Sequence, residues 1–289
     1  MTSAPLRALL AGSIDYAGLF PPAALPLAAV CANYCSESNS VESWALGRLL
    51  APASRLRDVA ELLPPQCAPW RVAALIGDDL AGDVATIRAM NATGTLTIEA
   101  AESRTHSIDA IVAAAHALDG VCALYAEIPV VDDPAPLVDA IAAAGARAKI
   151  RTGGVTPEAF PTPVQVARFI RCCSARSVTF KATAGLHHPM RGEYRLTYHT
   201  DAPCSTMFGF LNVFVAAALA RIDDRETTLV ALLEERDPAT LGFGPEGIRW
   251  REHFLPTHLV AETRNAFAIS FGSCSFREPI DDLHQLGLL

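Results

Sequence analysis

The sequence predicts an α/β fold, a (β/α)8 TIM barrel formed by a single domain over residues 1–289. Three observations support this prediction. Short apolar runs of strand length alternate with Ala- and Leu-rich stretches of helical length. Turn signals such as Gly77–Asp78, Thr93–Gly94 and Asp119–Gly120 fall between these segments. The chain has 289 residues, which is enough for eight such units, since a typical barrel takes about 250 residues.

The alternation can be followed along the whole chain. Strands are expected at residues 13–19, 45–51, 70–76, 95–100, 121–129, 146–152 and 178–183. The helices between them are expected at residues 26–35, 55–63, 80–90, 108–118, 134–144 and 163–173. The run AFAISFG at residues 266–272 is the best eighth strand, and it would close the barrel.

The segment 186–265 interrupts this regular pattern between the seventh and eighth strands. It contains helical stretches at residues 208–220 and 226–236 and the Gly- and Pro-rich passage LGFGPEG. We predict a long, partly helical insertion. A lid, an oligomer surface and plain scaffold decoration are the alternatives for its role.

Composition and charge exclude several classes of protein. Hydrophobic residues make up 51% of the chain and charged residues 19%, so it can form a sizeable core and is not a disordered chain. The net charge is −8 and there is no basic run, so we expect no nucleic-acid partner. The longest apolar run, 208–220, is too short to span a membrane. The first residues lack the features of a signal peptide, and the eight cysteines include no CxxC motif, so we expect reduced thiols and a cytoplasmic protein.

Two lysines remain in a chain that has 21 arginines, and both lie in predicted strands. Strand side chains alternate between faces, so Lys149 and Arg151 share one face of the sixth strand, while Lys181 and Thr183 share one face of the seventh. Glu127 lies on the fifth strand in the same way. We expect these charges to point into the barrel near the C-terminal ends of the strands, where barrels of this type carry their chemistry.

Two buried ammonium groups close together would lower each other's pKa. A neutral lysine amine could then attack a carbonyl carbon and form a Schiff base. Glu127 could transfer a proton or neutralise the positive charge. The alternative is a structural network of ion pairs that holds the core together.

The loops after the seventh and eighth strands form the usual phosphate cradle of a barrel. Gly185, His187 and His188 follow the seventh strand, while Gly272 and Ser273 end the eighth. Small residues let backbone amides approach an anion. The two histidines lack the spacing of a ligand set, so we expect them to contact substrate and predict no metal site and no cofactor.

Three further residues are weaker candidates. Asp15 at the end of the first strand is either a polar group at the barrel mouth or a helix cap. Glu99 faces either inward or outward from the fourth strand. Cys274 is a nucleophile only if a histidine lies beside it, and none is adjacent in the sequence.

The two lysine motifs resemble the deoxyribose-phosphate aldolase family of class I aldolases. Lys149-Ile150-Arg151-Thr152-Gly153 matches that family's strand-six motif, and Phe180-Lys181-Ala182-Thr183-Ala184-Gly185 matches its strand-seven motif. FGSCS at residues 271–275 and SIDYAGL at residues 13–19 are similar to its strand-eight and strand-one motifs.

The resemblance implies a barrel fold and a role for each matched residue. Lys149 would form the Schiff base and Lys181 would lower its pKa, while Gly185, Gly272 and Ser273 would line a phosphate site. The family also carries a proton-transferring Asp in strand four, where the sequence offers only Glu99 on the predicted strand.

The sequence therefore predicts a class I aldolase-like lyase that acts on a small phosphorylated or carboxylated carbonyl substrate. Arg151 stands where the family has a small polar residue, and its guanidinium suits a carboxylate. Thr152, Thr183 and Asp15 are expected to line the substrate site beside the loops. A cofactor-independent transferase or decarboxylase that uses the lysines and Arg151 as charges is one alternative. A non-catalytic assembly or sensor subunit is another, and the apolar insertion is consistent with a homo-oligomer.

Overall fold

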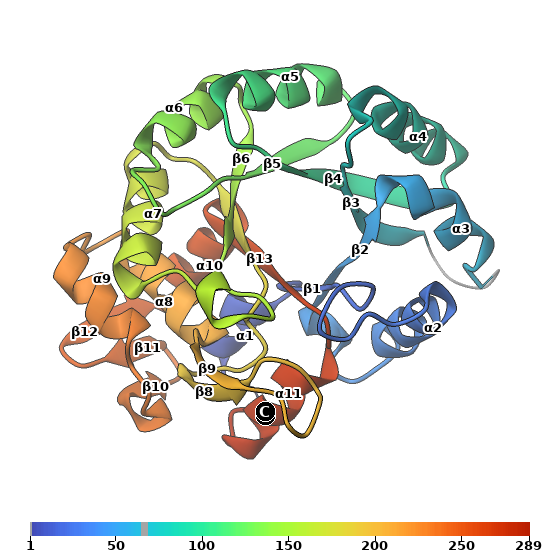
Figure 1. Cartoon of the computed structure of the whole chain (residues 1–289). Coiled ribbons are helices and arrows are strands. Elements are labelled where there is room, and N and C mark those ends of the chain that lie inside the picture. The colour runs from blue at the N-terminus through green and yellow to red at the C-terminus, as the bar shows by residue number, and fades with distance from the viewer. Residues whose placement is uncertain (1, 65–68) are drawn as a thin grey trace.

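The computed structural model describes residues 2–64 and 69–289. Eight parallel strands form a closed barrel in the order β1-β13-β7-β6-β5-β4-β3-β2, so the predicted fold is confirmed (Figure 1). In chain order these strands are β1 (Ile14–Tyr16), β2 (Leu46–Pro52), β3 (Trp70–Leu75), β4 (Leu96–Arg104), β5 (Ala123–Glu127), β6 (Arg147–Arg151), β7 (Phe180–Thr183) and β13 (Ala268–Ser273). Each overlaps a predicted strand, but β4 continues four residues beyond its predicted end at Ala100.

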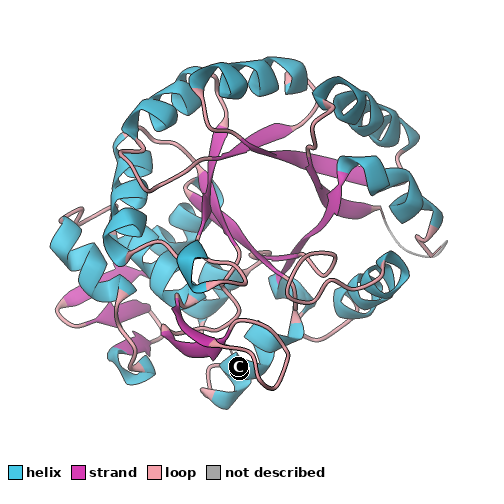
Figure 2. Cartoon of the chain, viewed as in Figure 1, coloured by secondary structure: helices cyan, strands magenta, loops and turns pink. Residues whose placement is uncertain are grey.

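Helices surround the barrel on its outer face (Figure 2). They include α2 (Leu27–Ser38), α3 (Leu56–Glu61), α4 (Leu80–Thr93), α5 (Ile108–Leu118), α6 (Ala135–Ala143) and α7 (Pro163–Ala175). Local sequence signals fix their ends. Thr162 and Gln165 form a capping box at the start of α7, and Gly94, with φ of 69°, ends α4 in the left-handed conformation that glycine adopts without strain.

The strands bury both faces, and the two faces differ in character. Outward-facing side chains such as Ile98, Ile150 and Ala182 pack against the helices in the main hydrophobic core. Inside the barrel, the apolar cluster is small and includes Leu50 and Tyr125. Charged side chains fill much of the remaining interior, which places the site at the centre of the fold.

The connection from β7 to β13 contains a β-hairpin, helices and a small antiparallel sheet. The hairpin of β8 (Gly192–Arg195) and β9 (Cys204–Met207) precedes helices α8 (Phe210–Leu219) and α9 (Glu226–Leu233). A small antiparallel sheet follows, formed by β10 (Leu241–Phe243), β11 (Gly247–Trp250) and β12 (His253–Pro256), and α10 (Thr257–Ala266) leads into β13. Helices α8 and α9 lie where the sequence predicts them, whereas the strands and α10 were not predicted.

Two terminal helices were also not predicted. Helix α1 (Ala4–Leu10) precedes the barrel, and α11 (Arg277–Gln285) follows it. Helix α11 places Glu278 and Asp282 beside the end of the barrel, where they pair with the histidines after β7. Among the described residues, none of the helices is both long and apolar enough to cross a membrane.

Candidate active site

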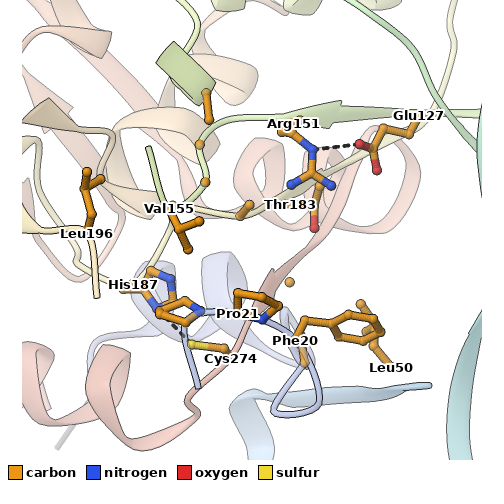
Figure 3. Close-up of a pocket in the computed structure, with 18 of the residues that line it drawn as sticks. Phe20, Pro21, Leu50, Glu127, Arg151, Val155, Thr183, His187, Leu196 and Cys274 are labelled. Carbon is orange, nitrogen blue, oxygen red and sulfur yellow. Dashed lines mark hydrogen bonds and ion pairs between the residues drawn. The ribbon is translucent and has the colours of Figure 1, made fainter. Parts of the chain in front are cut away.

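A cavity of about 880 Å³ opens at the C-terminal end of the barrel. It lies where the strand ends and the loops after them meet, and the β8–β9 hairpin forms part of its wall. Figure 3 shows Arg151, Glu127 and Thr183 on one side of it and His187 and Cys274 on another. Lys149 lines the cavity, and Lys181 is not among the described residues that do so.

Both lysines belong to one buried cluster of ion pairs. Lys149 on β6 and Lys181 on β7 are register partners, so their side chains leave adjacent strands at the same level. The Lys149 Nζ lies 2.7 Å from a carboxylate oxygen of Glu102 and 2.7 Å from one of Glu127. The Lys181 Nζ lies 2.5 Å from the other oxygen of Glu102 and also contacts Asp15. Glu102 therefore bridges the two ammonium groups.

The bridging carboxylate reverses the expected electrostatics of Lys181. Burial alone would lower the pKa of Lys181, but the charges of Asp15 and Glu102 raise it well above its ordinary value. The predicted lowering of the pKa by a neighbouring ammonium group is therefore wrong for Lys181, because a carboxylate lies between the two lysines. Lys181 acts as a fixed positive charge in this cluster.

The lysines in turn keep the bridging carboxylates ionised. Burial would raise the pKa of Glu102, but the charges of Lys149 and Lys181 lower it to about 2. Burial would also raise the pKa of Glu127, and Lys149 and Arg151 lower it. The cluster therefore holds two carboxylates around the Lys149 amine.

Sequence reasoning missed Glu102. The fourth strand was predicted to end at Ala100, which left Glu102 outside it, but β4 runs to Arg104 and points Glu102 into the barrel. The expectation that the strand offers only Glu99 is therefore wrong. Glu99 forms ion pairs with Arg71, at 2.7 Å, and Arg48, at 2.9 Å, and does not contact either lysine. The signal that could have identified Glu102 is its position two residues after Ala100, which puts both side chains on the same face of the strand.

Asp15 is fully buried within the barrel. Its carboxylate accepts hydrogen bonds from Ser270 Oγ at 2.7 Å and from the Arg48 backbone amide at 2.7 Å, in addition to its contact with Lys181. It is neither a helix cap nor one of the described residues that line the cavity. Asp15 contacts Lys181, whereas the sequence predicted that it would line the substrate site.

Arg151 is the cation at the mouth of the cluster. Its Nε donates to Glu127 Oε1 at 2.8 Å, and its side chain stays 37% exposed. Figure 3 shows the end of this guanidinium directed toward the cavity beside Thr183. Thr152 is buried instead, and its hydroxyl donates to the Ala184 carbonyl at 2.7 Å. Thr152 therefore holds the turn after β7, whereas Arg151 and Thr183 face the cavity.

The glycines of the predicted phosphate loops do line the cavity. Gly185 has φ of 72°, and a Cβ there would lie 3.0 Å from the Gly153 Cα and 2.9 Å from the Phe160 ring. The close approach of these two loops requires a residue without a side chain. Gly272 also lines the cavity, but the Ser273 hydroxyl donates to the Ser275 carbonyl at 2.7 Å and is buried.

A histidine lies beside Cys274, which the sequence could not reveal. His187 Nδ1 is 3.8 Å from Cys274 Sγ and 3.2 Å from a carboxylate oxygen of Glu278 (Figure 3). Burial would lower the pKa of His187, but its hydrogen bonds to Cys274 and Glu278 raise it to about 10. His188 stacks on Tyr194, with ring centroids 3.6 Å apart, and its Nδ1 lies 2.7 Å from an Asp282 carboxylate oxygen while its Nε2 lies 3.9 Å from Glu278. The wall beside the loop predicted to cradle phosphate thus includes a carboxylate, that of Glu278 on α11.

Metal ligation finds no support in the described part of the chain. No three or more His, Cys, Asp or Glu side chains are grouped there in a way that could hold a metal ion.

Comparison with known proteins finds similarity among solved structures. No protein-family model matches the chain, and no curated protein matches its sequence. Among solved structures, the chain is similar to deoxyribose phosphate aldolase from Aeropyrum pernix, which is described as a unique tetrameric structure. The TM-score is 0.46 and the sequence identity 16%, and the match covers 65% of this chain and 86% of that chain.

Proposed function

We propose that the protein is a class I aldolase-like lyase in which Lys149 forms a Schiff base with a small anionic carbonyl substrate. One observation carries this proposal. Lys149 lines the cavity at the C-terminal end of the barrel, while Lys181 lies behind it and is joined to it through Glu102. A reacting amine must reach the cavity, whereas a supporting charge need not.

The surroundings of Lys149 suit each step of imine formation. The ammonium must lose a proton before it attacks, and the carboxylate of Glu127, 2.7 Å away in the cavity wall, is the group placed to accept it. The amine then adds to the carbonyl carbon, and water leaves to give an iminium ion. That iminium is a cation, so the two carboxylates that surround the ammonium would also stabilise the intermediate.

The charge on the cavity wall favours a carboxylate-bearing substrate over a phosphorylated one. Arg151 and Arg104 supply positive charge near Glu127, and the Arg104 side chain is 72% exposed. The Glu278 carboxylate of α11 lines the opposite side of the cavity, where it would repel a phosphate dianion in the predicted cradle. A guanidinium matches the two oxygens of a carboxylate.

Borohydride trapping tests this function directly. The purified protein would be incubated with a panel of small keto acids, aldehydes and sugar phosphates, reduced, and digested for peptide mass spectrometry. Two lysines and the N-terminal amine are the groups that can form an imine in this chain. We expect a reduced adduct on Lys149 with a keto acid or another carboxylate-bearing carbonyl compound.

The two lysines provide matched controls. Lys149→Arg keeps the charge and should abolish both trapping and carbon–carbon bond cleavage, because a guanidinium does not form the imine. Lys181→Arg should still trap at Lys149, with a slower rate. An adduct on Lys181 would keep the chemistry and exchange the two roles. The absence of any adduct with ligands that raise the melting temperature would refute the aldolase proposal.

One observation favours a second candidate, a transferase or decarboxylase without a covalent intermediate. Both ammonium groups are ion-paired, and the pKa of Lys181 is raised, as expected for lysines that act as charges. In that case Lys149→Arg would lose activity only partly and would weaken substrate binding.

A further inference from the structure

The second reactive group in the cavity is the thiol of Cys274, on the loop after β13. It lies opposite the lysine cluster and lines the same cavity, although only 4% of the residue is exposed. Three polar side chains surround the sulfur or its partner histidine. They are His187 from the loop after β7, Tyr198 from the loop between β8 and β9, and Glu278 from α11. Three separate elements therefore converge on one thiol.

The hydrogen bonds of this group favour a charged pair. The Tyr198 hydroxyl lies 3.4 Å from Cys274 Sγ and donates to Glu278 at 3.1 Å. His187 Nδ1 lies within reach of both Sγ, at 3.8 Å, and Glu278, at 3.2 Å. A buried imidazolium between two acidic groups is stabilised by both, and it stabilises each as an anion.

The titration behaviour of the thiol agrees with this geometry. Burial would raise the pKa of Cys274, but the hydrogen bond and charge of His187 lower it below its ordinary value. The other buried thiols among the described residues are Cys31 and Cys173, and burial raises the pKa of both. Cys274 is thus set apart from thiols that merely fill the core.

We propose that Cys274 and His187 form a second reactive centre in this cavity, a thiolate–imidazolium pair that captures small α,β-unsaturated carbonyl compounds. A thiolate is a soft nucleophile, and the β-carbon of a conjugated carbonyl is a soft electrophile. The wall around Cys274 includes the apolar side chains of Pro21, Val155 and Leu196, which suit the carbon skeleton of such a ligand (Figure 3).

The addition balances within the pair. The Cys274 sulfur forms a bond to the β-carbon, the conjugated carbon–carbon π bond breaks, and the electron pair moves to give an enolate. The His187 imidazolium then gives its Nδ1 proton to the α-carbon. The product is a neutral thioether beside a neutral imidazole. The step uses no lysine, so it stands or falls separately from the Schiff-base proposal.

The test is competitive alkylation at pH 6, with each cysteine quantified by peptide mass spectrometry. Iodoacetamide reports the thiolate, and methyl vinyl ketone is the conjugated carbonyl probe. Cys204 on β9 is exposed and serves as the reference thiol in the same molecule. We expect both reagents to modify Cys274 before Cys204, although Cys274 is the more buried of the two.

Two variants separate the charge of His187 from simple access to the thiol. His187→Asn should slow alkylation of Cys274 at pH 6 by at least about tenfold, because each unit by which a thiol pKa rises above the pH removes about nine-tenths of the thiolate. Glu278→Gln keeps the histidine and removes one of its two acidic partners, so it should change the rate less than His187→Asn does. Circular dichroism and the unchanged rate at Cys204 would show that both variants are folded.

Three results would overturn the proposal. The first is modification of Cys204 ahead of Cys274 in the unaltered protein. The second is an H187N variant that alkylates at the original rate. The third is slowing by E278Q as large as that caused by H187N, since access and not the histidine charge would then control the thiol.

Discussion

Replacement of Glu102 by Gln is the perturbation that most directly tests the buried cluster. The two Glu102 oxygens lie 2.7 Å from the Lys149 ammonium and 2.5 Å from that of Lys181, and all three groups are shielded from water. The Glu102→Gln side chain has almost the same size but carries no charge. Both ammonium groups would then each keep one carboxylate partner, Glu127 or Asp15.

Two routes give a similar magnitude for the loss of stability. Removal of one partner from a buried ion pair costs about 3–5 kcal/mol. The pKa of Glu102 falls from 4.5 to about 2, and at about 1.4 kcal/mol per unit this corresponds to about 3 kcal/mol. For a chain of this size, that loss lowers the melting temperature by roughly 5–8 °C.

The direction of the Glu102 pKa shift determines how its contribution to stability changes with pH. Because the folded-state pKa of Glu102 is lowered, its contribution to stability is fully present above pH 4.5 and is lost as the pH falls toward about 2. The stability difference between the unaltered protein and the E102Q variant should therefore shrink over that range. Urea unfolding followed by circular dichroism at a series of pH values measures it.

Glu99→Gln is the matched control on the same strand. The Glu99 side chain is 27% exposed and pairs with the half-exposed Arg71 and with the buried Arg48, which keeps a contact with Asp15, so its replacement should cost less than that of Glu102. A double variant, Glu102→Gln with Lys181→Met, should lose less stability than the two single variants added together. An E102Q protein that is as stable as the E99Q protein, with unchanged acid sensitivity, would refute the reasoning.

Three further outcomes are expected. Arg151→Gln should weaken binding of a carboxylate-bearing carbonyl ligand by about tenfold and leave binding of a neutral analogue unchanged. Calorimetry can measure both affinities. An equal loss of affinity for the two ligands would contradict the charge role assigned to Arg151. Gly185→Ala should destabilise the protein by about 2 kcal/mol or more, and Gly145→Ala by about 1 kcal/mol. Both glycines have positive φ, but an added Cβ meets neighbouring atoms at Gly185 and none at Gly145. Equal denaturation midpoints for the two variants would argue against the loop contact at Gly185. Because the folded-state pKa of His187 is raised, the stability that it contributes should be complete below pH 6.5 and decline as the pH rises toward about 10. The measurement is the difference in urea midpoint between the unaltered protein and His187→Asn from pH 6 to 10. A constant difference over that range would exclude a charged His187.

The fold and the two lysines were accessible from local patterns. Strand alternation places Lys149, Arg151, Lys181 and Glu127 on inward faces, and the structure puts Lys149 and Lys181 at the same register. Such predictions succeed because the two-residue period of a strand and the helical crossovers of a parallel sheet are properties of short segments.

Strand ends were less predictable, and the wrong end predicted for the fourth strand is the reason that Glu102 was missed. The predicted strand stopped at Ala100, two residues before Glu102. The strand continues because its neighbours β3 and β5 pair with it as far as Glu102 and Arg104. The charge of Glu102 is accepted inside the barrel because the two lysines arrive there from other strands.

The sequence by itself determined that eight strands alternate with helices and that two lysines face inward. Only the tertiary structure decided which charges meet. Barrel closure sets β13 between β1 and β7, which brings Asp15 to Lys181 across 166 residues and Cys274 to His187 across 87. Contacts of this kind depend on the order and stagger of strands around the barrel, and no local period encodes that information.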